Sequence, residues 1–142
     1  MIDVPRDDLV LMLEAGYIYL AMGKFNEARQ IFEGVIALAP EREIPRVALG
    51  NVLFAQKKFL AAIRILKEAL DINSKSAFAH AHLGESLLFY GKKEQALEEL
   101  NAASKLEPNG KAGDFARSLM QLINMGYDPV RLKDEAKKAK QA

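Results

Sequence analysis

The feature of this sequence that most constrains its fold is an internal repeat with a period of 34 residues. Three columns of small or turn-forming residues recur at that spacing: Gly16, Gly50 and Gly84; Ala28, Ala62 and Ala96; Pro40, Ser74 and Pro108. A period of roughly 20 to 50 residues is typical of proteins that stack one supersecondary unit many times. The repeat therefore predicts a stack of similar units.

Within each repeat, the apolar residues follow the spacing of amphipathic helices, which predicts two helices joined by a turn. The expected helices span residues 9–22, 25–38, 43–56, 59–72, 77–90 and 93–106. Gly23 and Gly91 mark two of the turns. Pro40 and Pro108 end the second helices of their repeats, because proline lacks the N–H that an intrahelical hydrogen bond needs.

The repeated glycines fall inside helices, where each costs about 1 kcal/mol relative to alanine. A close crossing of the two helices of a repeat would explain this cost, with the alanine twelve residues later as the small partner. The expected contacts join Gly16 to Ala28, Gly50 to Ala62 and Gly84 to Ala96. A Gly50→Leu substitution would then overpack the crossing by roughly 1–3 kcal/mol.

This pattern resembles the tetratricopeptide-repeat (TPR) family, whose 34-residue helix-turn-helix units carry small residues at fixed positions and a closing proline. The resemblance implies an all-α fold, an α-solenoid. The whole chain, 1–142, would form one domain, which starts with an N-terminal arm at 1–8. Three repeat units would follow, at 9–42, 43–76 and 77–110. Met12, Arg46 and His80 stand where the family has tryptophan, and Ser74 replaces one closing proline.

Residues 111–142 depart from the repeat and are expected to cap it. A helix over 112–125 would cover the last repeat with one apolar face, formed by Phe115, Leu119, Leu122 and Ile123. Asp128 and Pro129 form a good N-cap and first-turn pair, which predicts a short extra helix over 128–140. Its lysines 137, 138 and 140 suit the negative end of the helix dipole, and contact with an anion is the alternative interpretation.

Composition argues against several classes of partner. The 20 Lys and Arg residues nearly balance the 19 Asp and Glu residues, so the net charge of +1 offers no field for nucleic acid or an anionic membrane. There is no cysteine, which excludes disulfides and fits a cytoplasmic location. The apolar run 9–22 is shorter than the roughly 20 residues that a membrane span needs, and the acidic N-terminus does not resemble a secretory signal.

Nothing in the sequence predicts a metal site or a cofactor, and an enzyme is only a remote alternative function. His80 and His82 are two residues apart on one helix, so their side chains should point in different directions. The Gly-Lys pairs lack the remainder of a phosphate-binding loop. Ser86 lacks the second glycine of a nucleophile elbow.

In the TPR family the first helix of each unit lines a concave face, and the resemblance places its exposed positions in this sequence. The resulting partner-binding groove consists of Leu13, Tyr17, Leu20, Val47, Asn51, Phe54, Ala81, Glu85 and Leu88, with Val10, Ile44 and Phe78 nearer the rim. Such an apolar set predicts binding of an extended peptide or an amphipathic helix of another protein, with Asn51 available to bond a peptide backbone. Any one of these residues could instead belong to the core.

Two known kinds of TPR domain suggest more specific versions of this function. The clamp by which some TPR domains bind the C-terminal carboxylate of chaperones uses lysines and asparagines at these positions. Here only Asn51 matches, while Leu13, Val47 and Ala81 are apolar, so the clamp is disfavoured. The architecture also resembles TPR-type bacterial type III secretion chaperones, which implies a chaperone for hydrophobic subunits.

The first expected helix is apolar almost all the way round, so one neighbouring helix cannot cover it. Either residues 1–8 fold back over it, or a second copy covers Leu11 and Ile18 in a homodimer. The rival to an adaptor or chaperone is a structural subunit that docks into a larger assembly through this helix and the convex face.

Overall fold

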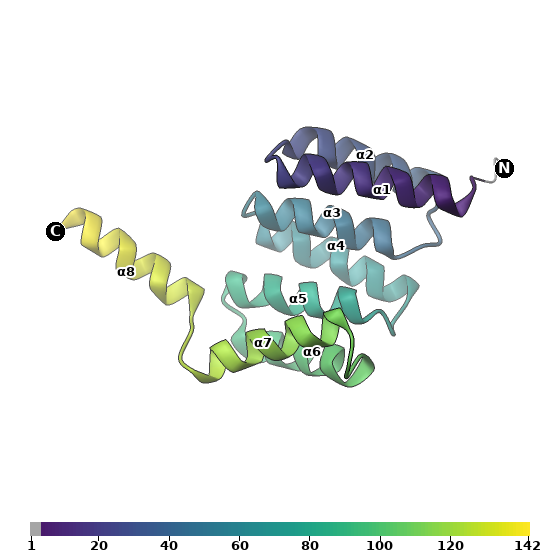
Figure 1. The fold of residues 1–142 in the computed structure, drawn as a ribbon. Coiled ribbons are helices and arrows are strands. Elements are labelled where there is room, and N and C mark those ends of the chain that lie inside the picture. Colours follow the sequence, from purple (N-terminus) through teal and green to yellow (C-terminus); the bar gives the residue numbers. More distant parts are fainter. Residues whose placement is uncertain (1–3) are drawn as a thin grey trace.

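The computed structural model describes residues 4–142, which form eight α-helices and no β-strand (Figure 1). The helices are α1 (Arg6–Ala21), α2 (Phe25–Leu38), α3 (Ile44–Ala55), α4 (Phe59–Ile72), α5 (Ala77–Tyr90), α6 (Lys93–Leu106), α7 (Lys111–Asn124) and α8 (Pro129–Gln141). The predicted all-α fold is confirmed, and four helices begin and end at the predicted residues. None of the described helices has the length and hydropathy that crossing a membrane requires.

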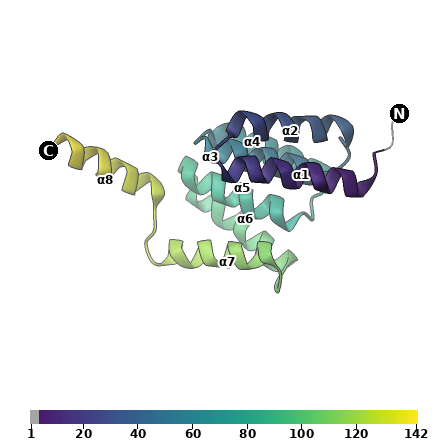
Figure 2. The same cartoon turned by 45° about the horizontal axis from the view of Figure 1, so that its top comes forward.

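The helices stack in antiparallel pairs, α1 with α2, α3 with α4 and α5 with α6. Each second helix contacts the first helix of the next pair, and α1, α3, α5 and α7 also contact one another in succession. These odd-numbered helices therefore form one layer of the solenoid, as Figure 1 shows. Figure 2 gives the same stack after rotation, with α8 projecting away from it.

The turns inside the pairs use a left-handed backbone conformation. Gly23 and Gly91 have φ angles of +75° and +97°, which glycine adopts without steric cost. The equivalent position of the second pair is Lys57, with a φ of 63°. A side chain in this conformation costs roughly 1–2 kcal/mol, so the second turn is strained where the other two are relaxed.

The repeated glycines do mark close helix crossings. The predicted alanine partner is confirmed at Gly84, whereas larger side chains lie nearest at Gly16 and Gly50. A Cβ on Gly16 would lie 2.3 Å from Phe32 Cε1, and Cβ atoms on Gly50 and Gly84 would lie 2.9 and 2.7 Å from Cγ of Leu66 and Leu100. The large side chains four residues after each alanine therefore occupy the space above the glycines. Among the three nearest atoms, an alanine contributes only at Gly84, through the Ala96 carbonyl oxygen at 3.1 Å.

Helix α7 covers the last pair, contacting α5 and α6 as a capping helix should. Leu119 and Ile123 are buried as predicted, and Phe115 is half-buried. Leu122 was predicted on the same face, but it is 42% exposed and lies on the outer side. Gly113 brings α7 close to the preceding turn, because a Cβ there would lie 1.7 Å from the Glu107 carbonyl oxygen.

The N-terminal arm is shorter than predicted, because α1 already begins at Arg6. Val4 packs against a small cluster formed by Leu9, Val35 and Ala39, while residues 1–3 lie outside the described part of the chain. The described residues of the arm leave Leu11 and Ile18 67% and 61% exposed.

Helix α8 starts as predicted, with the Asp128 carboxylate accepting hydrogen bonds from the backbone N–H groups of Val130 and Arg131 at 3.1 Å. None of its residues is buried, and α5 is the one described helix that it contacts. Helix α8 is therefore held at its first turn and otherwise extends into solvent (Figure 2).

Candidate functional site

An apolar cavity of about 450 Å³ opens on the layer of odd-numbered helices. Its lining comes from α1, α3 and α5 and consists of Tyr17, Ile44, Val47, Asn51, Phe78 and His82. We call this cavity the inner groove. Its volume lies within the roughly 300–1,000 Å³ typical of ligand sites.

Tyr17 and Asn51 form the polar centre of the inner groove. The side-chain amide of Asn51 donates a hydrogen bond to the Tyr17 hydroxyl at 3.2 Å. The ring of Tyr17 packs edge-on against Phe32, with centroids 5.2 Å apart. Burial raises the pKa of Tyr17 above its usual 10.0, and the hydrogen bond from Asn51 opposes that rise. The phenol is therefore neutral at physiological pH and offers a hydroxyl proton.

The structure divides the nine predicted groove residues among different environments. Tyr17, Val47 and Asn51 meet in the inner groove. Three members, Val47, Ala81 and Leu88, are 3%, 0% and 3% exposed and belong to the core, so the prediction that they face a partner is corrected. Val47 contributes only to the wall of the inner groove. These three residues are buried because α3 and α5 contact each other and also the second helix of the preceding pair.

The remaining predicted residues lie outside the inner groove. Leu13 and Leu20 are half-buried and pack against the core. Glu85 is also half-buried, with a carboxylate oxygen 3.4 Å from Nδ1 of His82. Phe54 lies in a separate pocket at the far ends of α3 and α5.

Sequence reasoning missed His82 as a groove residue because its position is not among the family's exposed columns. Its ring packs against Phe115 of α7, with centroids 5.3 Å apart. The neighbouring histidine, His80, turns away toward α6, where Nδ1 lies 2.6 Å from a carboxylate oxygen of Glu99. His82 enters the groove because the capping helix packs beside it, which the repeat pattern alone does not specify.

The described residues contain no group of three or more His, Asp or Glu side chains that could hold a metal ion. The inner groove itself combines apolar walls with a phenol, an amide and an imidazole. Such a lining can bury side chains and exchange hydrogen bonds with a peptide backbone.

Two models described as tetratricopeptide repeat match residues 13–77 and 53–119, which together cover most of the chain. Among curated proteins, the TPR repeat-containing thioredoxin TDX of Arabidopsis thaliana is 29% identical over 82% of this chain and 31% of its own length. The chain spans between 9% and 31% of the curated relatives that it matches.

Solved structures share the fold. The first TPR domain of Spaghetti (RPAP3), bound to an HSP90 peptide, superposes with a TM-score of 0.71 at 23% identity, covering 87% of this chain and 99% of that one. The Yersinia enterocolitica type III secretion chaperone SycD, in complex with a peptide of the translocator YopD, gives 0.70 at 20% identity, with 94% and 99% covered. Repeat period, helix pairing and both family models agree that the chain belongs to the tetratricopeptide-repeat family.

Proposed function

We propose that this chain is a protein-interaction module that binds an extended peptide or an amphipathic helix in the inner groove, as an adaptor or chaperone. The observation that carries this proposal is the groove itself, an open cavity with apolar walls around the Tyr17–Asn51 pair. Two solved structures of the same fold contain a bound peptide, one of HSP90 and one of YopD, which supports a peptide as the ligand here.

The groove offers both kinds of contact that peptide recognition needs. Ile44 and Phe78 are 39% and 40% exposed, so a bound apolar side chain can cover them and exclude water. Asn51 uses its amide N–H to bond Tyr17, while the described residues supply no donor to its amide oxygen. That oxygen can accept a hydrogen bond from a peptide N–H, which fixes the register of the ligand.

A peptide-display selection on the purified protein, followed by titration of the selected peptide, tests this proposal. Phe78→Glu places a charge in the groove and should weaken binding at least about tenfold, which corresponds to about 1.4 kcal/mol. Leu60→Glu is the matched control, because Leu60 is equally exposed at 40% but lies on α4, outside the groove. Equal affinities of the two variants would refute the groove as the binding site.

We also propose that α1 mediates self-association, because an exposed apolar stripe of Leu11, Ile18 and Met22 follows its outer face. These side chains are 67%, 61% and 59% exposed, more than most apolar residues of the chain. A second copy that presents the same stripe would bury it in a homodimer.

Sedimentation velocity tests this second proposal. The unmodified protein should dimerise at micromolar concentrations, and Leu11→Lys with Ile18→Lys should make it monomeric. Leu38→Lys with Leu60→Lys adds the same charges at other exposed leucines and should leave the dimer intact. A monomeric unmodified protein would contradict the homodimer.

A further inference from the structure

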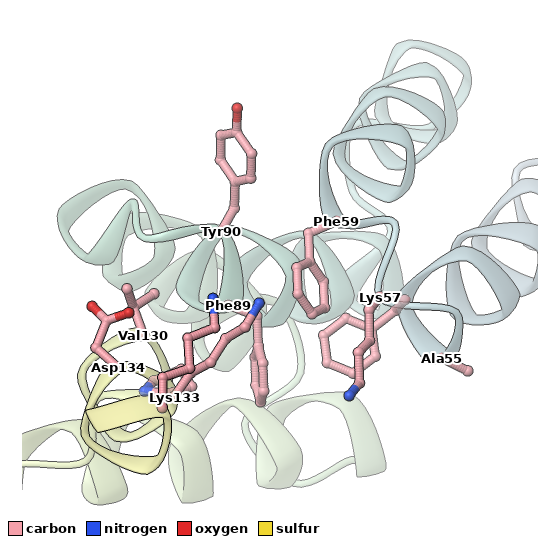
Figure 3. Close-up of a pocket in the computed structure, with 11 residues that line it drawn as sticks. Ala55, Lys57, Phe59, Phe89, Tyr90, Val130, Lys133 and Asp134 are labelled. Atoms are coloured by element: carbon pink, nitrogen blue, oxygen red, sulfur yellow. The ribbon is translucent and has the colours of Figure 1, made fainter. Parts of the chain in front are cut away.

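A second pocket, of about 560 Å³, lies where α8 approaches the C-terminal ends of α3 and α5 (Figure 3). The inner groove uses the earlier parts of α3 and α5, so the two sites share helices but no lining residue. We call this second site the α8 pocket. Its lining comprises Phe54, Ala55, Lys57, Phe59, Phe89, Tyr90, Pro129, Val130, Lys133, Asp134 and Lys137.

Three phenylalanines form the apolar floor of the α8 pocket. The ring centroid of Phe54 lies 5.3 Å from that of Phe59 and 5.0 Å from that of Phe89. The ring centroids of Phe59 and Phe89 lie 5.6 Å apart. Each of the three side chains is half-buried, so each retains surface that a ligand can cover. Figure 3 shows Tyr90 pointing away from Phe59 and Phe89, so its hydroxyl does not make this floor polar.

The rim of the α8 pocket is basic. Its lining includes three basic residues, Lys57 from the turn before α4 and Lys133 and Lys137 from α8, but only one acidic residue, Asp134. Within residues 4–142, none of these three lysines lies within 4.0 Å of a carboxylate oxygen in an ion pair. The whole chain carries a net charge of only +1, so this excess of positive charge is local.

Lys57 adds its charge to the rim at a cost in backbone energy. Its φ of 63° is the left-handed conformation that glycine adopts at the same point of the other two turns. At this position Lys57 places a cationic side chain in the lining of the pocket, whereas a glycine would contribute no side chain. Strain retained beside a cavity is a feature of ligand sites.

The α8 wall of the pocket is packed against the helix stack at one end only. Helix α8 is attached by its first turn, where a methyl group of Val130 lies 3.6 Å from the position that a Cβ on Gly91 would occupy. Beyond that turn its side chains are exposed, with five basic and two acidic residues between Pro129 and Gln141.

We propose that the α8 pocket is a second peptide site, which binds an acidic segment of a partner protein through one bulky apolar side chain. The apolar anchor packs on Phe54, Phe59 and Phe89, and flanking Asp or Glu carboxylates pair with Lys57, Lys133 and Lys137. This inference rests on the proposed function only in assuming that the chain binds peptides, since the site is separate from the inner groove.

The test uses three libraries of octapeptides, N-acetylated and C-amidated so that only side-chain carboxylates are present. The first carries a central Leu, Met or Phe among Asp and Glu residues, the second has Ala as its centre, and the third has Ser in place of the acids. Titration of the full chain followed by NMR should show binding of the first library alone, with shifts of the signals of Phe59 and Phe89. Binding should weaken as salt is raised, because the exposed charges are screened.

A matched pair of charge reversals locates the site. Lys133→Glu with Lys137→Glu should weaken binding about tenfold, because two exposed attractive pairs become repulsive. Lys138→Glu with Lys140→Glu makes the same change in charge on the same helix outside the pocket and should leave the affinity within about twofold. Circular dichroism checks that both variants keep their helicity.

Three results would overturn the proposal: no binding of the first library, equal binding of the Ala-centred library, or an equal loss of affinity in the two charge-reversed variants. An equal loss in the two variants would mean that the acidic peptides are attracted to the basic helix α8 in general and not to the pocket. Phe78→Glu blocks the inner groove and should not affect these peptides. Failure of the inner groove and failure of the α8 pocket are therefore observed in separate variants.

Discussion

Substituting Gly84 by alanine tests how closely the paired helices cross. The new Cβ would lie 2.7 and 2.8 Å from Cγ and Cδ2 of Leu100 and 3.1 Å from the carbonyl oxygen of Ala96. Leu100 is fully buried, so its side chain has no free space to move into. The Ala96 oxygen belongs to the backbone of α6, so the helix itself has to shift.

The expected change in the free energy of unfolding is the difference between two opposing effects of the new methyl group. Alanine is favoured over glycine in a helix interior by about 1 kcal/mol, whereas overpacking a filled core costs typically about 1–3 kcal/mol. Gly84→Ala should therefore lower the free energy of unfolding by roughly 1 kcal/mol, because backbone has to move. Gly34→Ala is the control, because Gly34 also lies within a helix but a Cβ there would have no neighbour within 4 Å.

Urea unfolding followed by circular dichroism measures both variants. Gly34→Ala should raise the free energy of unfolding by about 0.5–1 kcal/mol and Gly84→Ala should lower it, so the midpoints move in opposite directions. If Gly84→Ala were as stabilising as Gly34→Ala, the crossing would have room for a methyl group. The steric explanation of the repeated glycines would then be refuted.

Three further predictions concern other parts of the chain. Lys57→Gly should raise the free energy of unfolding, measured by urea unfolding, by about 1 kcal/mol, because it removes the left-handed strain. The same substitution should weaken the binding of acidic peptides to the α8 pocket. Asn51→Leu should raise the pKa of Tyr17 further, because it removes the hydrogen bond that favours the phenolate, and ultraviolet titration against Tyr17→Phe measures it. Since the native pKa lies above the unfolded value, the stability that Tyr17 contributes is complete below pH 10 and is lost as pH rises through the native pKa. Gly113→Ala should displace α7 and destabilise the chain by more than about 2 kcal/mol, with increased binding of a hydrophobic dye, because its Cβ would meet the Glu107 carbonyl oxygen.

The helices themselves could be predicted from the sequence, because the signals for them are local. Apolar spacing, turn glycines and closing prolines act within a few residues, and α2, α4, α5 and α6 have the predicted bounds. The 34-residue period also predicted which helices pair, because each repeat unit can bury its apolar face only against its neighbours. The family and the all-α solenoid followed from the same 34-residue spacing.

Tertiary packing decided which of the inner-layer residues can meet a partner. Val47, Ala81 and Leu88 occupy columns expected to be exposed, yet they are buried, because exposure depends on the distance between helix pairs rather than on position within one helix. Phe54 joined the α8 pocket instead of the inner groove for a similar reason. Periodicity specifies the face of a helix, whereas the direction of α8 and the approach of neighbouring pairs arise from contacts between residues far apart in the sequence.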